Sequence, residues 1–206
     1  MLPALILGEL ATRGIGNVSL ETIHPQSDET GKMEDGGWLR VKSWCKANGG
    51  ANIQTFFEPL FADQPGLDAI VFHVDGDSLL DVCRASKIEQ PKLPVSAKAR
   101  VAHIVDVVHE WLAVSDKYRS KVVLAIPVQS TEAWILAAEA SYHDLEDIDA
   151  KREFLRTFSR GINLEKFYKH RADAARDKTS KIAEQSQSFT LFRNAMLETL
   201  GAETAP

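Results

Sequence analysis

The chain has 206 residues, of which 44% are hydrophobic and 26% are charged, and it carries a formal net charge of −5. That length suits one main domain with a sizeable core, and no apolar run approaches the ~20 residues that a membrane-spanning helix needs. The acidic balance argues against a surface coated with the Lys and Arg clusters that non-specific DNA binding requires. The opening residues lack the basic start and the cleavage site of a secretory signal, so we expect a cytoplasmic protein without membrane contact.

The first third of the chain predicts helices, a strand and a loop. Apolar residues recur at helical spacing near the start, and Gly14 is placed as a helix stop. The alternating segment NVSLETI (17–23) predicts a half-buried strand, and the polar, glycine-containing residues 24–37 predict a loop. The helices predicted in this part span residues 2–12, 38–47 and 52–61.

The middle of the chain predicts a parallel sheet. Two short runs of β-favouring residues, DAIVFHV (68–74) and VVLAIP (122–127), have the apolar character of buried strands. A helical pattern follows each of them, and this alternation is typical of an α/β fold with a parallel central sheet flanked by helices. Residues 1–145 are predicted to form that domain, and residues 146–206 a helical, basic extension. Helices are predicted over residues 97–114, 131–140 and 189–200.

Carboxylates follow both predicted strands, at the edge where open α/β sheets place their sites. Asp75 and Asp77 come directly after the first strand, separated by one glycine, and Glu132 lies just beyond the second. Two anionic side chains this close repel each other unless a cation lies between them, and Mg²⁺ prefers carboxylate and water oxygens. A metal site is one interpretation. The other is that the aspartates cap a turn and a helix, and that Glu132 is a first-turn charge facing the helix dipole.

Three residues with reactive side chains are expected to be structural. Cys45 and Cys83 lie far apart without a Cys or His neighbour at zinc-site spacing, so both are predicted to be reduced thiols. His73 points to the opposite face of its strand from Val74, and we expect a packed core histidine rather than a base.

The order of the motifs carries a family resemblance. A strand followed by HVDGDS, a long helix, a strand followed by IPVQSTEAWILAAE, and a basic tail containing FYKHRADAARDKTSK resembles the small Toprim-like proteins of bacteria. Many of these are associated with phage defence beside an ATPase, and Toprim domains also occur in topoisomerases, primases and overcoming-lysogenization-defect nucleases. The resemblance covers about residues 2–200 and implies a Rossmann-like Toprim fold.

Carried over by position, the resemblance implies a Mg²⁺- or Mn²⁺-dependent nuclease acting on DNA or RNA. Asp75 and Asp77 match its Asp-x-Asp metal ligands, and Glu132 matches the acidic residue after the next strand. Lys178 resembles a lysine of related nucleases that contacts phosphate, and a solvated helix lysine is the alternative. Lys181 and Arg176 are further cations of this tail. The implied partners are a nucleic-acid substrate and an ATPase, with a homo-oligomer left open.

The sequence departs from the family at one point. Toprim chemistry also uses a glutamate directly after an initial strand, and the chain begins instead with a predicted helix. The strand with that glutamate is then expected before Met1, or the domain is degenerate and binds a partner without catalysis. A further alternative treats ALILGE as the strand and Glu9 as the glutamate. A haloacid dehalogenase-type phosphatase with Asp75 as nucleophile is a separate alternative.

Overall fold

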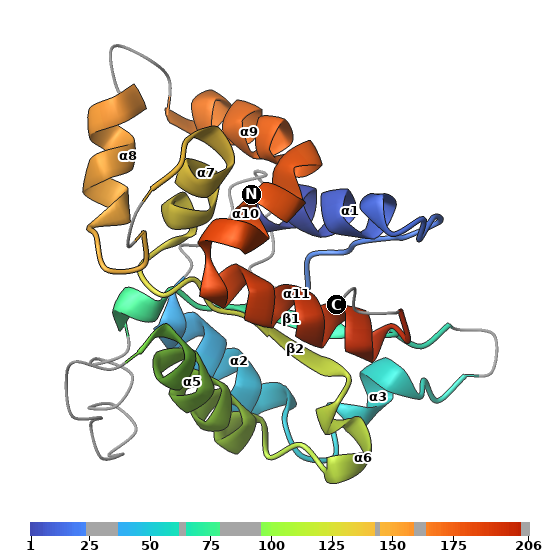
Figure 1. Cartoon of the computed structure of the whole chain (residues 1–206). Coiled ribbons are helices and arrows are strands. Elements are labelled where there is room, and N and C mark those ends of the chain that lie inside the picture. The colour runs from blue at the N-terminus through green and yellow to red at the C-terminus, as the bar shows by residue number, and fades with distance from the viewer. Residues whose placement is uncertain (24–36, 62–64, 79–95, 143–144, 159–163, 203–206) are drawn as a thin grey trace.

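The chain forms a small parallel sheet surrounded by helices (Figure 1). The computed structural model describes residues 1–23, 37–61, 65–78, 96–142, 145–158 and 164–202. The strands are β1 (Ile70–His73) and β2 (Val122–Ala125), and the 3₁₀ turns are η1 (Gly76–Ser78) and η2 (Arg176–Lys178). The helices are α1 (Leu2–Thr12), α2 (Trp38–Asn48), α3 (Gln54–Phe57), α5 (Ala97–Leu112), α6 (Asp116–Arg119), α7 (Thr131–Glu139), α8 (Ala150–Phe158), α9 (Leu164–Ala175), α10 (Thr179–Gln185) and α11 (Gln187–Thr199). This confirms a mixed α/β chain that is mostly helical.

The two strands pair in parallel, in a register that runs from Ile70 opposite Val122 to His73 opposite Ala125. Because successive side chains of a strand point to opposite faces, the sheet separates two hydrophobic cores. Val122 and Leu124 face a cluster with α2 and α5, whereas Val123 and Ala125 face α1, α7, α10 and α11. Figure 1 shows α2 and α5 on one side of the strands, and α1, α7 and α10 on the other.

Helix α5 crosses from one strand to the next and covers one face of the sheet. The Ser96 hydroxyl caps it by accepting a 3.2 Å hydrogen bond from the Ala99 amide, and the helix ends at Leu112, followed by Ala113, which adopts a left-handed φ of 45°. Its apolar face is buried against the sheet through residues such as Val101, Ile104 and Val108. The predicted helix over 97–114 is therefore confirmed, with an end two residues earlier.

The C-terminal helices share a core with the sheet. Trp134 of α7 is completely buried, stacks on Phe192 and meets Phe189 edge-on. Its indole N–H donates a 3.1 Å hydrogen bond to Ser188 Oγ at the start of α11. Buried residues of α1, β2, α7, α10 and α11 belong to one hydrophobic cluster. The predicted extension after residue 145 is thus packed onto the α/β core.

Two predictions for the first third of the chain need correction. Residues 17–23 form no regular structure, and Leu20 within them is 41% exposed. Alternation alone does not make a strand, because a strand needs a hydrogen-bonding neighbour, and among the described residues β1 pairs only with β2. The predicted helix over 52–61 is limited to α3. The predicted loop over 24–37 lies outside the described residues except for Gly37.

Within the described ranges, no helix combines the length and the apolar character that crossing a membrane requires. Cys45 of α2 is a buried free thiol, and burial raises its pKa to about 12. This agrees with a reduced cysteine in the core. Cys83 lies outside the described residues.

Candidate site at the carboxyl edge of the sheet

A hydrogen-bonded cluster joins the end of β1 to the start of α7. Asp75 Oδ1 accepts hydrogen bonds from the Thr131 amide at 3.2 Å and from the Thr131 hydroxyl at 3.1 Å. His73 Nε2 lies 2.7 Å from Thr131 Oγ1 and 3.5 Å from Asp75 Oδ1. Parallel pairing of β1 and β2 creates this cluster, since it brings the carboxyl ends of both strands to one edge.

The hydroxyl group of Thr131 links Asp75 to His73. It donates to Asp75 Oδ1 and lies within hydrogen-bond distance of His73 Nε2, where the direction of the bond depends on the tautomer of the imidazole. The His73 side chain is 36% exposed. His73 does lie on the face opposite Val74, as predicted, but it belongs to a polar edge and not to the packed core.

The surroundings of Asp75 stabilise its ionised form. Burial works against ionisation, but hydrogen bonding and charge from His73, with the side-chain and backbone hydrogen bonds from Thr131, outweigh it and hold the pKa of Asp75 below the ordinary value. All the contacts described for this carboxylate are made by Oδ1. The side chain is 39% exposed, so an ionised oxygen is left for a ligand.

Asp75 is also a helix cap. Its Oδ1 accepts the amide proton of Thr131, the first residue of α7, and so satisfies one of the amides that every helix start leaves unpaired. Ser130, the residue at the usual capping position, makes no side-chain cap bond. The capping interpretation had Asp75 capping a turn after β1, whereas its Oδ1 caps α7, the helix that follows β2.

The glycine between the two aspartates is required by a close approach of two turns. The amides of Gly76 and Asp77 donate to the carbonyls of Pro127 and Gln129, at 2.8 and 3.0 Å. A Cβ on Gly76 would lie 2.4 Å from the carbonyl oxygen of Val128, which no side chain tolerates. Asp77 is exposed. The Asp-Gly-Asp segment is thus tied by its backbone to the segment after β2.

Glu132 directly follows Thr131 in α7, but its side chain is hydrogen-bonded to another helix. It is 8% exposed, and its Oε1 accepts a 2.9 Å hydrogen bond from the Tyr168 hydroxyl of α9. Burial, with the hydrogen bond and charge of Glu132, raises the pKa of Tyr168. In the part of the chain that the structure describes, no three His, Cys, Asp or Glu side chains are grouped to hold a metal ion. The predicted convergence of three carboxylates is not seen there.

The basic tail gathers at the far end of α7. Lys178 Nζ lies 3.6 Å from Glu139 Oε1, and Arg171 Nη1 lies 3.4 Å from Glu139 Oε2. Lys181 donates to the Ala138 carbonyl at 3.2 Å. Glu139 ends the helix that Thr131 begins, and at ~1.5 Å per residue their Cα atoms are about 12 Å apart. The structure does not bring Lys178 to Asp75, and Arg176 is exposed beside it on η2.

Glu9 does not follow a strand. The segment ALILGE lies within α1, so the alternative that treats it as an initial strand is wrong. Glu9 is 1% exposed, and its Oε1 accepts a 3.1 Å hydrogen bond from Arg13 one turn later. The apolar residues of ALILGE are compatible with a strand as well as with a helix. In the structure this segment is helical and α1 packs against η2 and α9.

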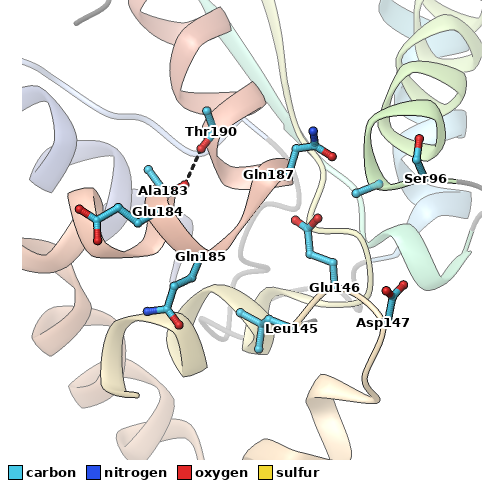
Figure 2. Close-up of a pocket in the computed structure, with 10 residues that line it drawn as sticks. Ser96, Leu145, Glu146, Asp147, Ala183, Glu184, Gln185, Gln187 and Thr190 are labelled. Atoms are coloured by element: carbon cyan, nitrogen blue, oxygen red, sulfur yellow. Dashed lines mark hydrogen bonds between the residues drawn. The ribbon is translucent and has the colours of Figure 1, made fainter. Parts of the chain in front are cut away.

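A separate cavity of about 590 Å³ lies between the start of α5, residues 145–147 and the junction of α10 with α11. Figure 2 shows Glu146, Asp147 and Gln187 around it. Glu146 Oε1 accepts from Ser186 Oγ at 2.9 Å and from the Ser188 amide at 2.7 Å, which fixes this carboxylate at the start of α11. Among the described residues its lining includes carboxylates and amides but no Lys or Arg. Such a lining disfavours phosphate.

Sequence reasoning missed two side chains at the edge. Thr131 was hidden because a threonine at a helix start is common, and only the pairing of the strands places it at Asp75. Arg100 of α5 was missed because its hydrogen-bond partner, the carbonyl of Val128, is distant in sequence.

Comparison of the chain with protein-family models, with curated proteins and with solved structures finds no match.

Proposed function

We propose that this chain is a Mg²⁺-dependent phosphodiesterase that cleaves nucleic acid at the carboxyl edge of its sheet, on a Rossmann-like fold of the Toprim kind. One observation carries the proposal: Asp75 is stabilised as a carboxylate through Oδ1 while its side chain stays 39% exposed, two residues from the exposed Asp77. The surrounding helix start and strand ends place both aspartates where α/β folds bind ligands.

The donor set fits Mg²⁺, which takes carboxylate and water oxygens. Asp75 and Asp77 would hold the ion, and Glu132 joins them by the family resemblance alone, since Tyr168 occupies its Oε1. The ion supplies positive charge for the phosphodiester and promotes ionisation of water. The remaining work belongs to the chain: Thr131 and His73 orient Asp75 and keep it ionised.

The family resemblance extends the proposal to a setting. We place the activity in the cytoplasm, in phage defence, with an ATPase as partner. The acidic net charge of −5 is consistent with a partner that contributes affinity for the nucleic acid. A degenerate domain that binds a partner without catalysis is the competing proposal, and the pairing of Lys178 with Glu139, away from Asp75, is the observation that favours it.

The test is metal-dependent cleavage of plasmid DNA and of total tRNA. The Asp75→Asn, Asp77→Asn chain removes two charges but retains acceptors for the Thr131 donors. Asp116→Asn is the matched control, because this exposed aspartate lies on α6, directly before β2 and thus at the opposite edge. Cleavage by the wild type and by the control, but not by the double variant, is expected. Equal cleavage by all three chains would show that these aspartates are not the catalytic site. No cleavage by any of them would favour the degenerate domain that binds a partner without catalysis.

A further inference from the structure

Arg100 lies beside the Asp75-Gly76-Asp77 turn although it comes from a different element. It occupies the first turns of α5, which packs against η1. Its Nη1 donates a 3.2 Å hydrogen bond to the Val128 carbonyl oxygen. The same oxygen would lie 2.4 Å from a Cβ on Gly76. One carbonyl therefore separates the guanidinium group from the backbone between the two aspartates.

The charge of Arg100 has no anionic partner among the described residues. It is half-buried, its Nε is buried without a hydrogen-bond partner, and no described carboxylate lies within ion-pair distance of it. Arginine stays protonated at every relevant pH, and charges withdrawn from water are normally paired. A guanidinium with one N–H bond to a carbonyl keeps further donors for a planar, two-pronged contact with an anion.

We propose that Arg100 binds a phosphate oxygen of the substrate at this edge, in place of the basic tail. This inference rests on the proposed function for the location of the phosphate. The tail cation Lys178 is paired with Glu139 at the other end of α7, whereas Arg100 lies at the turn that presents Asp75 and Asp77. Asp75 and Asp77 would hold the ion beside such a phosphate, and Arg100 would supply a second positive charge to it.

The test measures binding of a fluorescein-labelled dT₁₂ strand in Ca²⁺, which allows binding without requiring cleavage. Arg100→Gln should weaken the Kd at least tenfold, as expected for loss of a charge-assisted contact. It should also lower the slope of log affinity against log salt by about 0.7, the value for one phosphate contact with a single strand. Lys98→Gln is the matched control, because Lys98 is an exposed cation two residues away on the same helix.

A Lys98→Gln loss as large as that of Arg100→Gln, or an unchanged Kd and slope for Arg100→Gln, overturns the inference. Arg100→Lys keeps a donor for the Val128 carbonyl and provides a second variant if Arg100→Gln fails to fold. It should weaken binding about threefold, because it loses the planar fork, and leave the slope of log affinity against log salt unchanged. Wild-type affinity in the lysine chain also contradicts the inference. Cleavage of DNA or RNA with Mg²⁺ is scored separately, so binding through Arg100 without cleavage would refute the proposed function alone.

Discussion

Replacing Thr131 by valine tests how Asp75 is held. Valine keeps the branched shape and nearly the same helix propensity, but it removes the hydroxyl that donates to Asp75 and is hydrogen-bonded to His73. Thr131 is 3% exposed, so water cannot easily replace the hydroxyl. The variant leaves the Thr131 amide bond to Asp75 in place. The loss therefore isolates the side-chain contribution.

The magnitude follows from the hydrogen bonds. A hydrogen bond to a charged group contributes about 1.5–3 kcal/mol, and because the Asp75 side chain is 39% exposed, the lower part of that range applies. We expect Thr131→Val to lower the free energy of unfolding by ~1–2 kcal/mol. For a chain of this length that corresponds to a fall in Tm of ~2–8 °C.

Urea unfolding at pH 7, followed by tryptophan fluorescence, measures this difference. Thr131→Ser retains the hydroxyl and should unfold close to the wild type. In a double-mutant cycle with Asp75→Ala, the coupling between the two positions should be ~1 kcal/mol. A coupling near zero, or equal stability of the valine, serine and wild-type chains, would refute the hydrogen-bonded cluster.

Three further predictions concern single groups. The folded-state pKa of Asp75 is depressed, so its ionisation stabilises the fold above the ordinary pKa of 3.8, and this contribution is lost as pH falls through the folded-state pKa. In urea unfolding between pH 7 and pH 2, the free energies of unfolding of Asp75→Asn and wild type should therefore converge at the acid end. Tyr168→Phe should lower the free energy of unfolding by about 1–3 kcal/mol, because it leaves the buried Glu132 oxygen without its donor, and calorimetry that finds an unchanged Tm would contradict this. In a Cys83→Ser chain, Cys45 should react with a thiol reagent at pH 8 only at the rate of unfolding, because burial raises its pKa to about 12; rapid labelling of the native chain would show that α2 is not packed as described.

The sequence predicted the elements whose signals are local. The β1 and β2 runs are short, apolar and rich in β-favouring residues, and both form strands that pair in parallel. The apolar stripe of α5 and its Ser96 cap are also local signals, and the helix begins where they indicate. Adjacent parallel strands have their carboxyl ends at the same edge, so the sequence also predicted the position of Asp75 at a shared edge.

The features that sequence did not predict depend on distant partners. Alternation in residues 17–23 is a real pattern, but a strand also needs a neighbour that no local signal supplies. The basic tail made Lys178 a candidate phosphate-binding lysine, but in the structure its Nζ lies 3.6 Å from Glu139 Oε1. Glu132 had two interpretations, a metal ligand and a first-turn charge; it does lie in the first turn of α7, but neither interpretation included its hydrogen bond to Tyr168. Each contact joins residues 36 or more positions apart, a separation over which single-sequence patterns carry no information.

The most direct test of a metal site at Asp75 and Asp77 is a Mn²⁺ titration followed by electron paramagnetic resonance, which counts bound ions without requiring any substrate. The account predicts about one to two bound ions per wild-type chain, the same number for the Asp116→Asn control, and loss of binding in the Asp75→Asn, Asp77→Asn chain. Equal binding by the double variant and the wild type, or no bound ion in either, would contradict it.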